Sequence, residues 1–147
     1  MVGRYRRIGS LVVVACVLGL GAIVPATESS ASSTRATAVP AAMVGCWHRH
    51  VGALPVGTPA GTWLIGITRA GRLAAYTPGS RRCNAYFDFS TTISVSGKRL
   101  TIGKVPICPT KGTYSWKSAT GTLTLRATAD AACSPRPLLF NGVWKRQ

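Results

Sequence analysis

Three side chains with metal-binding chemistry are spaced two residues apart near position 50: Cys46, His48 and His50. Successive side chains of a β-strand point to opposite faces, so this spacing places all three on one face. One thiolate and two imidazoles could together bind a soft or borderline metal ion. The simpler interpretation is a disulfide cysteine beside two surface histidines. We favour that interpretation and therefore predict no metal site and no cofactor.

Acid–base catalysis usually needs a placed carboxylate or a histidine with a partner. After residue 38 the carboxylate side chains are Asp88 and Asp130. Asp88 falls on the polar side of an alternating segment, which indicates a solvated surface charge. Asp130 lies near Cys133 and Arg136, where a local turn or an ion pair is the expected role. The many serines lack a Gly-x-Ser-x-Gly motif, and we expect no enzymatic activity.

Four cysteines follow residue 38: Cys46, Cys83, Cys108 and Cys133. An even number in an exported chain predicts two disulfides, and no pair has the two-residue spacing of a zinc knuckle. Four cysteines allow three connectivities, and the sequence selects none of them. Hairpin geometry favours a Cys83–Cys108 bridge, because these residues flank a pair of expected strands. Cys46 would then pair with Cys133.

The chain begins with the features of an export signal. Three arginines among the first seven residues precede an apolar run from Ile8 to Val24, and small residues follow it. This order is typical of a secretory signal peptide. We expect the signal to span residues 1–31, with cleavage somewhere between 26 and 38. Lipidation at Cys16, or retention of the run as an anchor, are the alternatives.

The segment after the signal is rich in Ser, Thr, Ala and Pro. Such a composition cannot bury a core, so we expect residues 32–41 to form a disordered linker. The remaining residues, 42–147, suffice for one domain with a single core. We therefore predict a secreted or extracytoplasmic protein, with association with the cell envelope as a further option.

Residues 39–147 contain fourteen Lys and Arg residues against two Asp residues, which gives a formal charge of +12. The basic residues are spread over expected strand ends and loops. Such scatter is weak evidence for sequence-specific binding of nucleic acid, and we expect none. Net charge of this size still favours salt-sensitive adhesion to polyanions. Outside a cell these would be anionic wall polymers or lipid headgroups.

Strict alternation of apolar and polar residues dominates the domain, most clearly from Tyr86 to Val95. This period is typical of half-buried strands, and Gly-containing turns separate the alternating runs. We expect eight strands, near residues 44–51, 61–69, 72–77, 84–95, 99–105, 112–117, 121–128 and 138–146. Short connections favour neighbouring antiparallel strands. The sequence thus predicts an all-β fold, an eight-stranded antiparallel up-and-down barrel, with a two-sheet sandwich as the alternative.

The two ends of the domain carry a family resemblance. Gly45-Cys46-Trp47 resembles the Gly-x-Trp motif of lipocalins and related calycin barrels. Arg146 resembles the basic residue that packs over the tryptophan of that motif. The segment with Gly112-Thr113-Tyr114-Ser115-Trp116 also resembles small lipocalin-like domains of secreted bacterial proteins. The resemblance implies a barrel fold.

A second resemblance is to META-type domains of the heat-shock lipoprotein kind. It rests on Cys83-Asn84-Ala85-Tyr86, Leu100-Thr101-Ile102-Gly103 and Cys108-Pro109. The Thr and Met that precede the second cysteine in those domains are missing from this chain.

An eight-stranded barrel has an interior that side chains can fill or that can hold one small ligand. The candidates for lining such a cavity are the larger apolar residues of the strands: Trp63, Phe87, Phe89, Ile93, Tyr114 and Trp116. We therefore expect a small monomeric protein that binds an apolar molecule. The alternative is an envelope protein that binds anionic polymers or lipid headgroups through its basic exterior.

Overall fold

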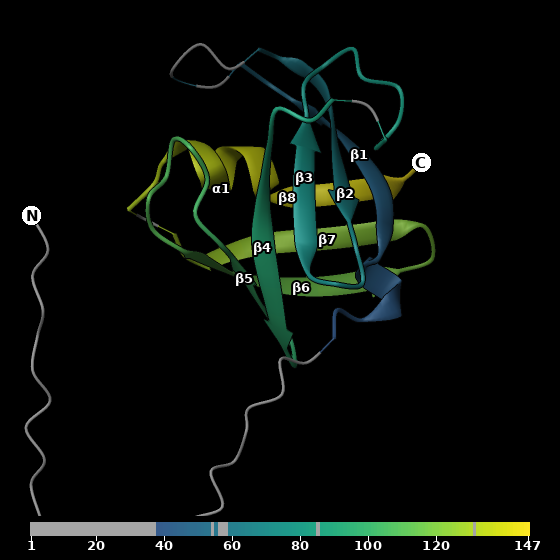
Figure 1. Cartoon of the computed structure of the whole chain (residues 1–147), viewed down its shortest axis with the longest axis vertical. Coiled ribbons are helices and arrows are strands. Elements are labelled where there is room, and N and C mark those ends of the chain that lie inside the picture. Colours follow the sequence, from purple (N-terminus) through teal and green to yellow (C-terminus); the bar gives the residue numbers. More distant parts are fainter. Residues whose placement is uncertain (1–37, 54, 56–58, 85, 131) are drawn as a thin grey trace, which may run out of the picture. The chain divides into compact units, whose positions relative to one another are not determined.

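The computed structural model describes residues 38–53, 55, 59–84, 86–130 and 132–147. They form a closed antiparallel barrel in which each strand pairs with its neighbours in the chain and β1 pairs with β8 (Figure 1). The strands are β1 (Gly45–Val51), β2 (Gly61–Ile67), β3 (Arg72–Tyr76), β4 (Phe89–Ser96), β5 (Arg99–Ile102), β6 (Gly112–Ala119), β7 (Thr122–Ala129) and β8 (Gly142–Arg146). The predicted eight-stranded up-and-down barrel is confirmed, and the barrel is consistent with a lipocalin-like fold.

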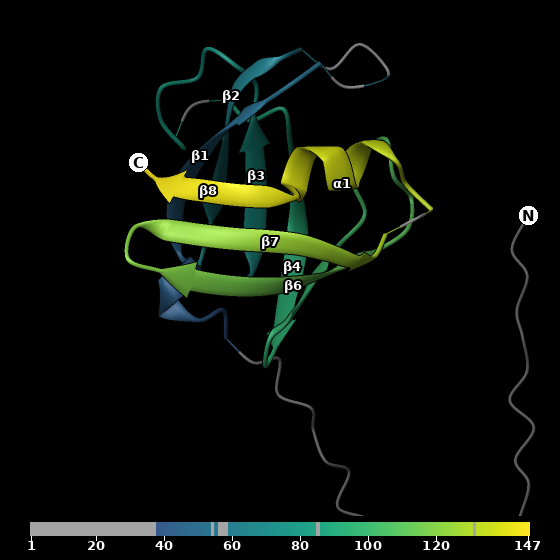
Figure 2. The same ribbon diagram turned by 180° about the vertical axis from the view of Figure 1, so that it is seen from behind.

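Three of the expected strands differ from the observed ones by three residues or more. The strand expected to run to residue 105 ends at Ile102, where the connection to β6 begins. The strand expected from residue 84 begins only at Phe89, because residues 77–88 form the connection from β3. The strand expected from residue 138 is preceded by a short helix, α1 (Pro135–Phe140), so β8 begins only at Gly142. Pro135 starts this helix, where the missing N–H of proline costs no hydrogen bond. Figure 2 shows α1 where β8 begins, with β6, β7 and β8 side by side.

The two ends of the barrel carry different connections. One end holds three tight turns, β2 to β3, β4 to β5 and β6 to β7, in which Gly71, Gly97 and Gly121 have positive φ angles of 79°, 56° and 69°. We call it the hairpin end. The opposite end holds the longer connections 52–60, 77–88, 103–111 and 130–141, and we call it the long-connection end.

Large apolar side chains fill the barrel. The bulkiest fully buried ones are Trp47, Trp63, Trp144, Tyr114, Phe140 and Met43. Residues before β1 contribute as well, because Val39 is buried and η1 (Ala41–Met43) places Met43 in the core. The core therefore begins within the segment expected to be a linker. The expected signal peptide, 1–31, lies outside the described residues.

The motif at the start of β1 has the geometry that the lipocalin resemblance implies. The guanidinium carbon of Arg146 lies 4.3 Å from the ring centroid of Trp47, and Arg146 Nη1 donates to the carbonyl of Val44 at 3.2 Å. A Cβ at Gly45 would meet Arg146 Nη1 at 2.7 Å, and the φ of Gly45 is 145°. The backbone conformation thus favours glycine here, and a side chain would also have to displace the Arg146 guanidinium.

None of the helices in the described ranges is long and apolar enough to span a membrane.

Candidate functional site

Two disulfides fasten the long connections: one joins connection 77–88 to β1, and the other joins connections 103–111 and 130–141 to each other. Cys46 pairs with Cys83 and Cys108 with Cys133, with Cα–Cα distances of 5.7 and 5.6 Å. The expectation of two disulfides is confirmed, but the favoured pairing, Cys83–Cys108 with Cys46–Cys133, is wrong. The pairing predicted from hairpin geometry fails because Cys83 lies in a connection that folds over the outer face of β2. The Cβ of Cys83 would lie 3.2 Å from a Cβ built at Gly66 on that strand.

The second disulfide holds segment 103–111 against the helical connection. Val105 and Cys108 form an isolated antiparallel bridge, with N–H to carbonyl distances of 3.0 and 2.8 Å. Val105, Cys108 and Cys133 make a small buried cluster, against which Phe89 packs. This segment therefore has a defined conformation although it contains no strand of its own.

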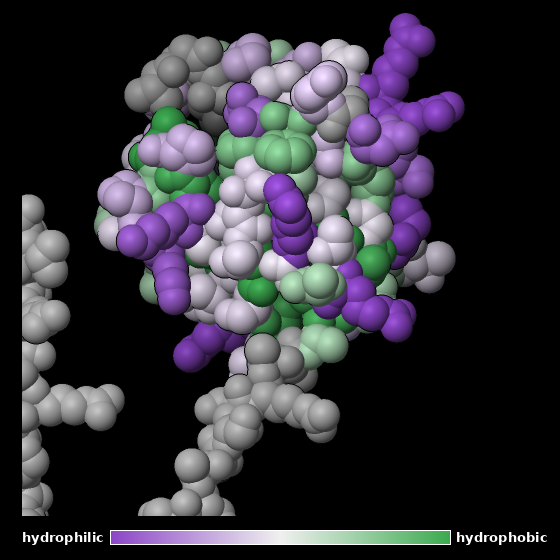
Figure 3. Space-filling view, viewed as in Figure 1, coloured by the Kyte–Doolittle hydropathy of each residue, from purple (hydrophilic) through white to green (hydrophobic). Residues whose placement is uncertain are grey.

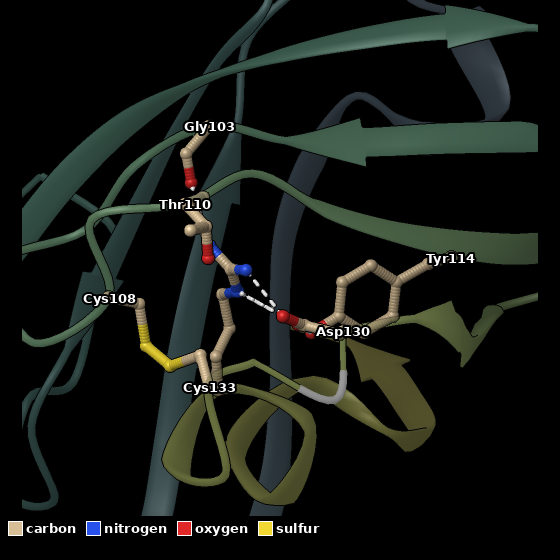
Figure 4. The surroundings of a disulfide bond; sticks show 7 residues. Gly103, Cys108, Thr110, Tyr114, Asp130 and Cys133 are labelled. Atoms are coloured by element: carbon tan, nitrogen blue, oxygen red, sulfur yellow. Dashed lines mark hydrogen bonds and ion pairs between the residues drawn. A yellow bond between two sulfur atoms is a disulfide. The ribbon is translucent and has the colours of Figure 1, made fainter.

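A buried charged network lies beside this disulfide (Figure 4). Arg136 is 1% exposed, and its Nε donates to the Asp130 carboxylate oxygens at 2.8 and 3.0 Å. Its Nη1 donates to the carbonyls of Thr110 and Gly103 at 2.6 and 3.2 Å. The Tyr114 hydroxyl donates to Asp130 Oδ2. Arg136 thereby ties α1 to both ends of segment 103–111, and the expected ion pair at Asp130 is confirmed.

The network changes the titration of Tyr114 and Arg136. Burial, together with the hydrogen bond to Asp130, raises the pKa of the Tyr114 phenol far above its usual value near 10. The hydrogen bond to Asp130 raises the pKa of Arg136, against the opposing effect of burial. Both shifts favour the protonated side chains. Tyr114 and Arg136 therefore stay protonated at physiological pH.

Gly112, at the start of β6, makes room for this ion pair. A Cβ at this position would lie 2.5 Å from Asp130 Oδ2 and 2.9 Å from Arg136 Nε. Real Cβ atoms do not approach so closely, so any side chain here would push the ion pair away from β6. The glycine is thus required by the packing of two charged side chains against the backbone.

Arg49 fastens the other end of α1. It points inward from β1 and donates to the carbonyls of Leu138 and Leu139 at 2.8 and 3.0 Å, and to that of Asn141. Its guanidinium carbon also lies 5.5 Å from the ring centroid of Trp144. Carbonyls at a helix C-terminus lack intrahelical donors, and a cationic donor satisfies them well. Burial lowers the pKa of Arg49 from its ordinary value.

The segments fixed in this way enclose an apolar cleft at the long-connection end. Its volume is about 240 Å³. Aromatic and aliphatic side chains from β2, β4, segment 103–111 and α1 supply most of its wall. The lining residues are Trp63, Asp88, Phe89, Val105, Pro106, Ile107, Pro135, Arg136, Leu139 and Phe140. In the space-filling view, hydrophobic surface gathers on the side where Figure 1 places α1 and the β5–β6 connection (Figure 3).

The six residues expected to line a cavity have three different locations. Trp63 and Phe89 lie at the cleft. Ile93 and Tyr114 belong to the packed core, and Trp116 packs against that core from a half-buried position. Phe87 lies outside the barrel, 47% exposed, with the Arg72 guanidinium 5.4 Å from its ring centroid. Of the six, Trp63 and Phe89 are therefore the ones that line the cleft, whereas Ile93, Tyr114 and Trp116 belong to or pack against the core that also contains Trp63.

Sequence reasoning missed the cleft residues outside the strands, such as Ile107, Leu139 and Phe140. Ile107 is 55% exposed in segment 103–111, whereas Phe140 is fully buried. One signal was available, since Pro135 and Pro137 before two leucines and a phenylalanine are compatible with a short apolar helix.

Asp88 is exposed, as expected for a surface charge, but it also lines the cleft. Its backbone N–H donates to the carbonyl of Ala75 at 2.8 Å, which fixes it immediately before β4.

Cys46 forms a disulfide with Cys83, so the possible metal-binding set of Cys46, His48 and His50 has no free thiolate. Within the described ranges, no group of three potential metal-ligating side chains comes together.

The outer face of β5, β6 and β7 gathers basic residues. Arg99, Ser115 and Arg126 are direct register partners across the three strands, and Lys117 follows on β6. A shallow depression on this face is lined by Ser115, Trp116, Lys117, Thr124 and Arg126. Adjacent strands lie about 4.8 Å apart, so Arg99 and Arg126 are roughly 10 Å apart along the sheet.

Comparison of the chain with family models, with curated proteins and with solved structures finds no match.

Proposed function

We propose that this protein binds a small apolar molecule in the cleft at the long-connection end of its barrel. The observation that carries the proposal is the cleft itself, about 240 Å³ and walled mainly by aromatic and aliphatic side chains. Ligand sites in proteins are concave, largely apolar and formed in advance of binding, with few polar groups. The cleft has all of these properties.

The fixed positions of the lining segments support a binding role. Segment 103–111 is attached by a disulfide and by Arg136, and α1 is attached by Arg136 and Arg49. A rigid site loses little conformational entropy when a ligand binds. Buried charges of this kind are costly for a small domain, and here they hold together the walls of a cleft.

The ligand volume follows from the cleft. An apolar cavity of about 150 Å³ can hold benzene. A cleft of about 240 Å³ suits one ring with a short substituent, rather than a long fatty acid. The packed core, with three buried tryptophans, argues for a ligand at the mouth of the barrel rather than along its axis.

The proposed setting is extracytoplasmic. Two disulfides fit an oxidising compartment, and the first 24 residues have the order of an export signal. We also propose that the barrel is related to lipocalins, on the Gly-x-Trp motif and the stacking of Arg146 on Trp47.

A titration of oxidised, isotope-labelled protein with toluene and indole, followed by NMR, tests the binding function. We expect saturable shifts of the backbone amides of Phe89, Val105, Ile107 and Leu139. Ile107→Asp should abolish them, because it places a charge in the wall at an exposed position that folding tolerates. The control is Val143→Asp, which is as exposed (51% against 55%) but lies on β8 away from the cleft. Absence of saturable shifts in the wild-type protein would overturn the proposal.

The outer face of β5–β7 supports a second function, the binding of an anionic envelope polymer. Arg99, Lys117 and Arg126 are exposed side by side, and neither Asp88 nor Asp130 lies among them. The Lys98 ammonium lies 5.0 Å from the ring centroid of Trp116 and adds charge at the edge of this face. Such a row matches the repeated negative charges of a phosphate-bearing polymer.

Cosedimentation with poly(glycerol phosphate)-coated beads tests this second function. Arg99→Gln/Arg126→Gln should weaken binding several-fold, and the loss should exceed that of Arg81→Gln/Arg82→Gln. The control pair removes the same charge from an exposed connection elsewhere. If the two pairs weaken binding equally, net charge alone explains the binding and a specific site is overturned. Parallel cosedimentation with anionic lipid vesicles distinguishes binding of the polymer from binding of lipid headgroups.

A further inference from the structure

The charges at the cleft point to a more specific ligand class. Among its lining residues, Asp88 and Arg136 are the charged ones, and the remainder are apolar. A buried arginine and an exposed aspartate differ in how strongly their charges can interact with a bound ligand.

Arg136 has no charge to offer a ligand. All three of its side-chain nitrogens donate to protein oxygens, those of Asp130, Gly103 and Thr110. Its ion pair with Asp130 is fully buried on both sides. An anionic ligand would therefore find the guanidinium already neutralised and enclosed.

Asp88 differs from Arg136 both in its exposure and in its lack of a paired partner. Its residue is exposed, and no hydrogen bond or ion pair of its carboxylate is found among the described residues. It is the one carboxylate side chain of the described ranges that remains without a cationic partner, because Asp130 is used by Arg136. In a domain with a formal charge of +12, the cleft therefore carries a local negative charge.

The aromatic wall reinforces this preference. Trp63, Phe89 and Phe140 come from β2, β4 and α1 and line the cleft, but Trp63 and Phe140 are fully buried, so among these rings it is the half-buried Phe89 that a bound molecule would meet. The face of an aromatic ring attracts cations, most strongly where water is excluded. The exposed Asp88 carboxylate beside the Phe89 ring is suited to a positively charged head on an apolar body.

We infer that the cleft selects an organic cation, a single-ring or short-chain apolar molecule with an ammonium group. This inference rests on the proposed function, because it names the class of ligand for the same cleft. Asp88 would contact the ammonium group, and the accessible apolar residues of the cleft, Phe89, Pro106 and Ile107, would contact the apolar body. From its net positive charge alone, the domain would be expected to prefer an anionic ligand, which is the opposite of the preference inferred here.

Three probes of similar size test the inference on the oxidised protein: benzyltrimethylammonium, its neutral isostere neopentylbenzene, and phenylacetate. Calorimetric or NMR titration should give tighter binding of the cation than of the anion. Asp88→Asn should reduce the ratio of cation to isostere affinity about three- to tenfold and leave the isostere itself unchanged. The control Ser96→Lys, at the far end of β4, raises the net charge by the same amount and should leave the ratio unchanged.

The outcomes separate the inference from the function on which it rests. If neopentylbenzene binds in the cleft but phenylacetate binds as tightly as the cation, the inference is overturned and the proposed function stands. The same holds if Asp88→Asn and Ser96→Lys change the ratio equally, because long-range charge would then explain it. If none of the three probes binds, the proposed function fails, and the inference fails with it.

Discussion

The two ends of the barrel are closed by different physical means. At the hairpin end, three glycine turns join the strands, and Met43 of η1 is fully buried in the core. The Trp47 indole N–H donates to the carbonyl of Met43 at 2.9 Å, and Arg146 covers its ring. At the long-connection end, a disulfide and the Arg136–Asp130 pair hold two connections around a cleft.

This difference in closure means that the hairpin end contributes stability, whereas the long-connection end also forms the proposed binding site. Apolar packing with local turns closes an end without leaving space. Charged side chains with several carbonyl acceptors can instead hold connections apart, because each fixes the position of several backbone segments at once. The cost is desolvation of the charges, which such a pair recovers only with good geometry. At the long-connection end these desolvated charges are present, and the cleft lies between the connections that they hold.

The largest effect is expected from breaking the buried pair. Arg136→Met leaves the Asp130 carboxylate buried without a cation and removes donors from Gly103 and Thr110. Removal of one partner of a buried ion pair typically costs about 3–5 kcal/mol. We expect a loss of this size in the free energy of unfolding by urea, measured by tryptophan fluorescence.

Adding Asp130→Asn to Arg136→Met serves as the control, because it removes the stranded charge. The double variant should be more stable than Arg136→Met alone. A cost below about 1 kcal/mol for the single variant would contradict the view that the long-connection end depends on this pair.

The two disulfides offer a second test. In the chain-entropy model, loops of 25 and 37 residues stabilise by nearly the same amount, roughly 3–4 kcal/mol. We therefore expect Cys108→Ala/Cys133→Ala and Cys46→Ala/Cys83→Ala to lose similar free energies of unfolding. Only the former should also weaken binding of toluene in the cleft, measured by NMR below the unfolding transition. Equal loss of binding in both pairs would show that general loosening, and not the position of segment 103–111, controls the cleft.

The alkaline stability of the protein reports on the same network. Burial and the hydrogen bond to Asp130 raise the pKa of Tyr114 in the folded state, whereas an unfolded tyrosine titrates near 10. Above pH 10 the unfolded chain releases this proton and the folded chain keeps it, so stability falls as the pH rises. Tyr114 alone should account for a loss of roughly 1 kcal/mol by pH 11.

Tyr114→Phe should remove that component, so the free energy of unfolding should fall less between pH 9 and pH 11 than in the wild type. Tyr86→Phe is the matched control, because the Tyr86 side chain is fully exposed and should leave the pH dependence unchanged. Identical pH profiles for wild type and Tyr114→Phe would contradict a buried, protonated phenol.

The sequence predicts the hairpin end better than the long-connection end. Alternation along β4 and the glycine at Gly97 are local signals, and they locate a strand and its turn correctly. The pairing of Trp47 with Arg146 could be expected only through a family resemblance, since 99 positions separate the two residues. At this end the pattern and the packing agree.

The long-connection end depends on contacts that have no local signal. Asp130 and Arg136 are close enough in sequence for their ion pair to be expected, but Gly103 and Thr110 are not. The disulfide pairing follows from where connection 77–88 folds, which strand periodicity does not specify. The six-residue helix α1 is too short to display a helical period. The cleft could not be predicted because several such connections form it together.

The smallest effect is expected at the hairpin end. Arg146→Gln removes the cation that stacks on Trp47 and the hydrogen bond to the Val44 carbonyl, both at an exposed residue. Exposed cation–π contacts contribute about 0.5–1 kcal/mol, so urea unfolding should shift by that amount. Arg146→Lys, which keeps the charge, should recover part of the loss. Binding of toluene should not change in either variant, because Arg146 lies at the end away from the cleft; an altered affinity would mean that the two ends are coupled through the packed core.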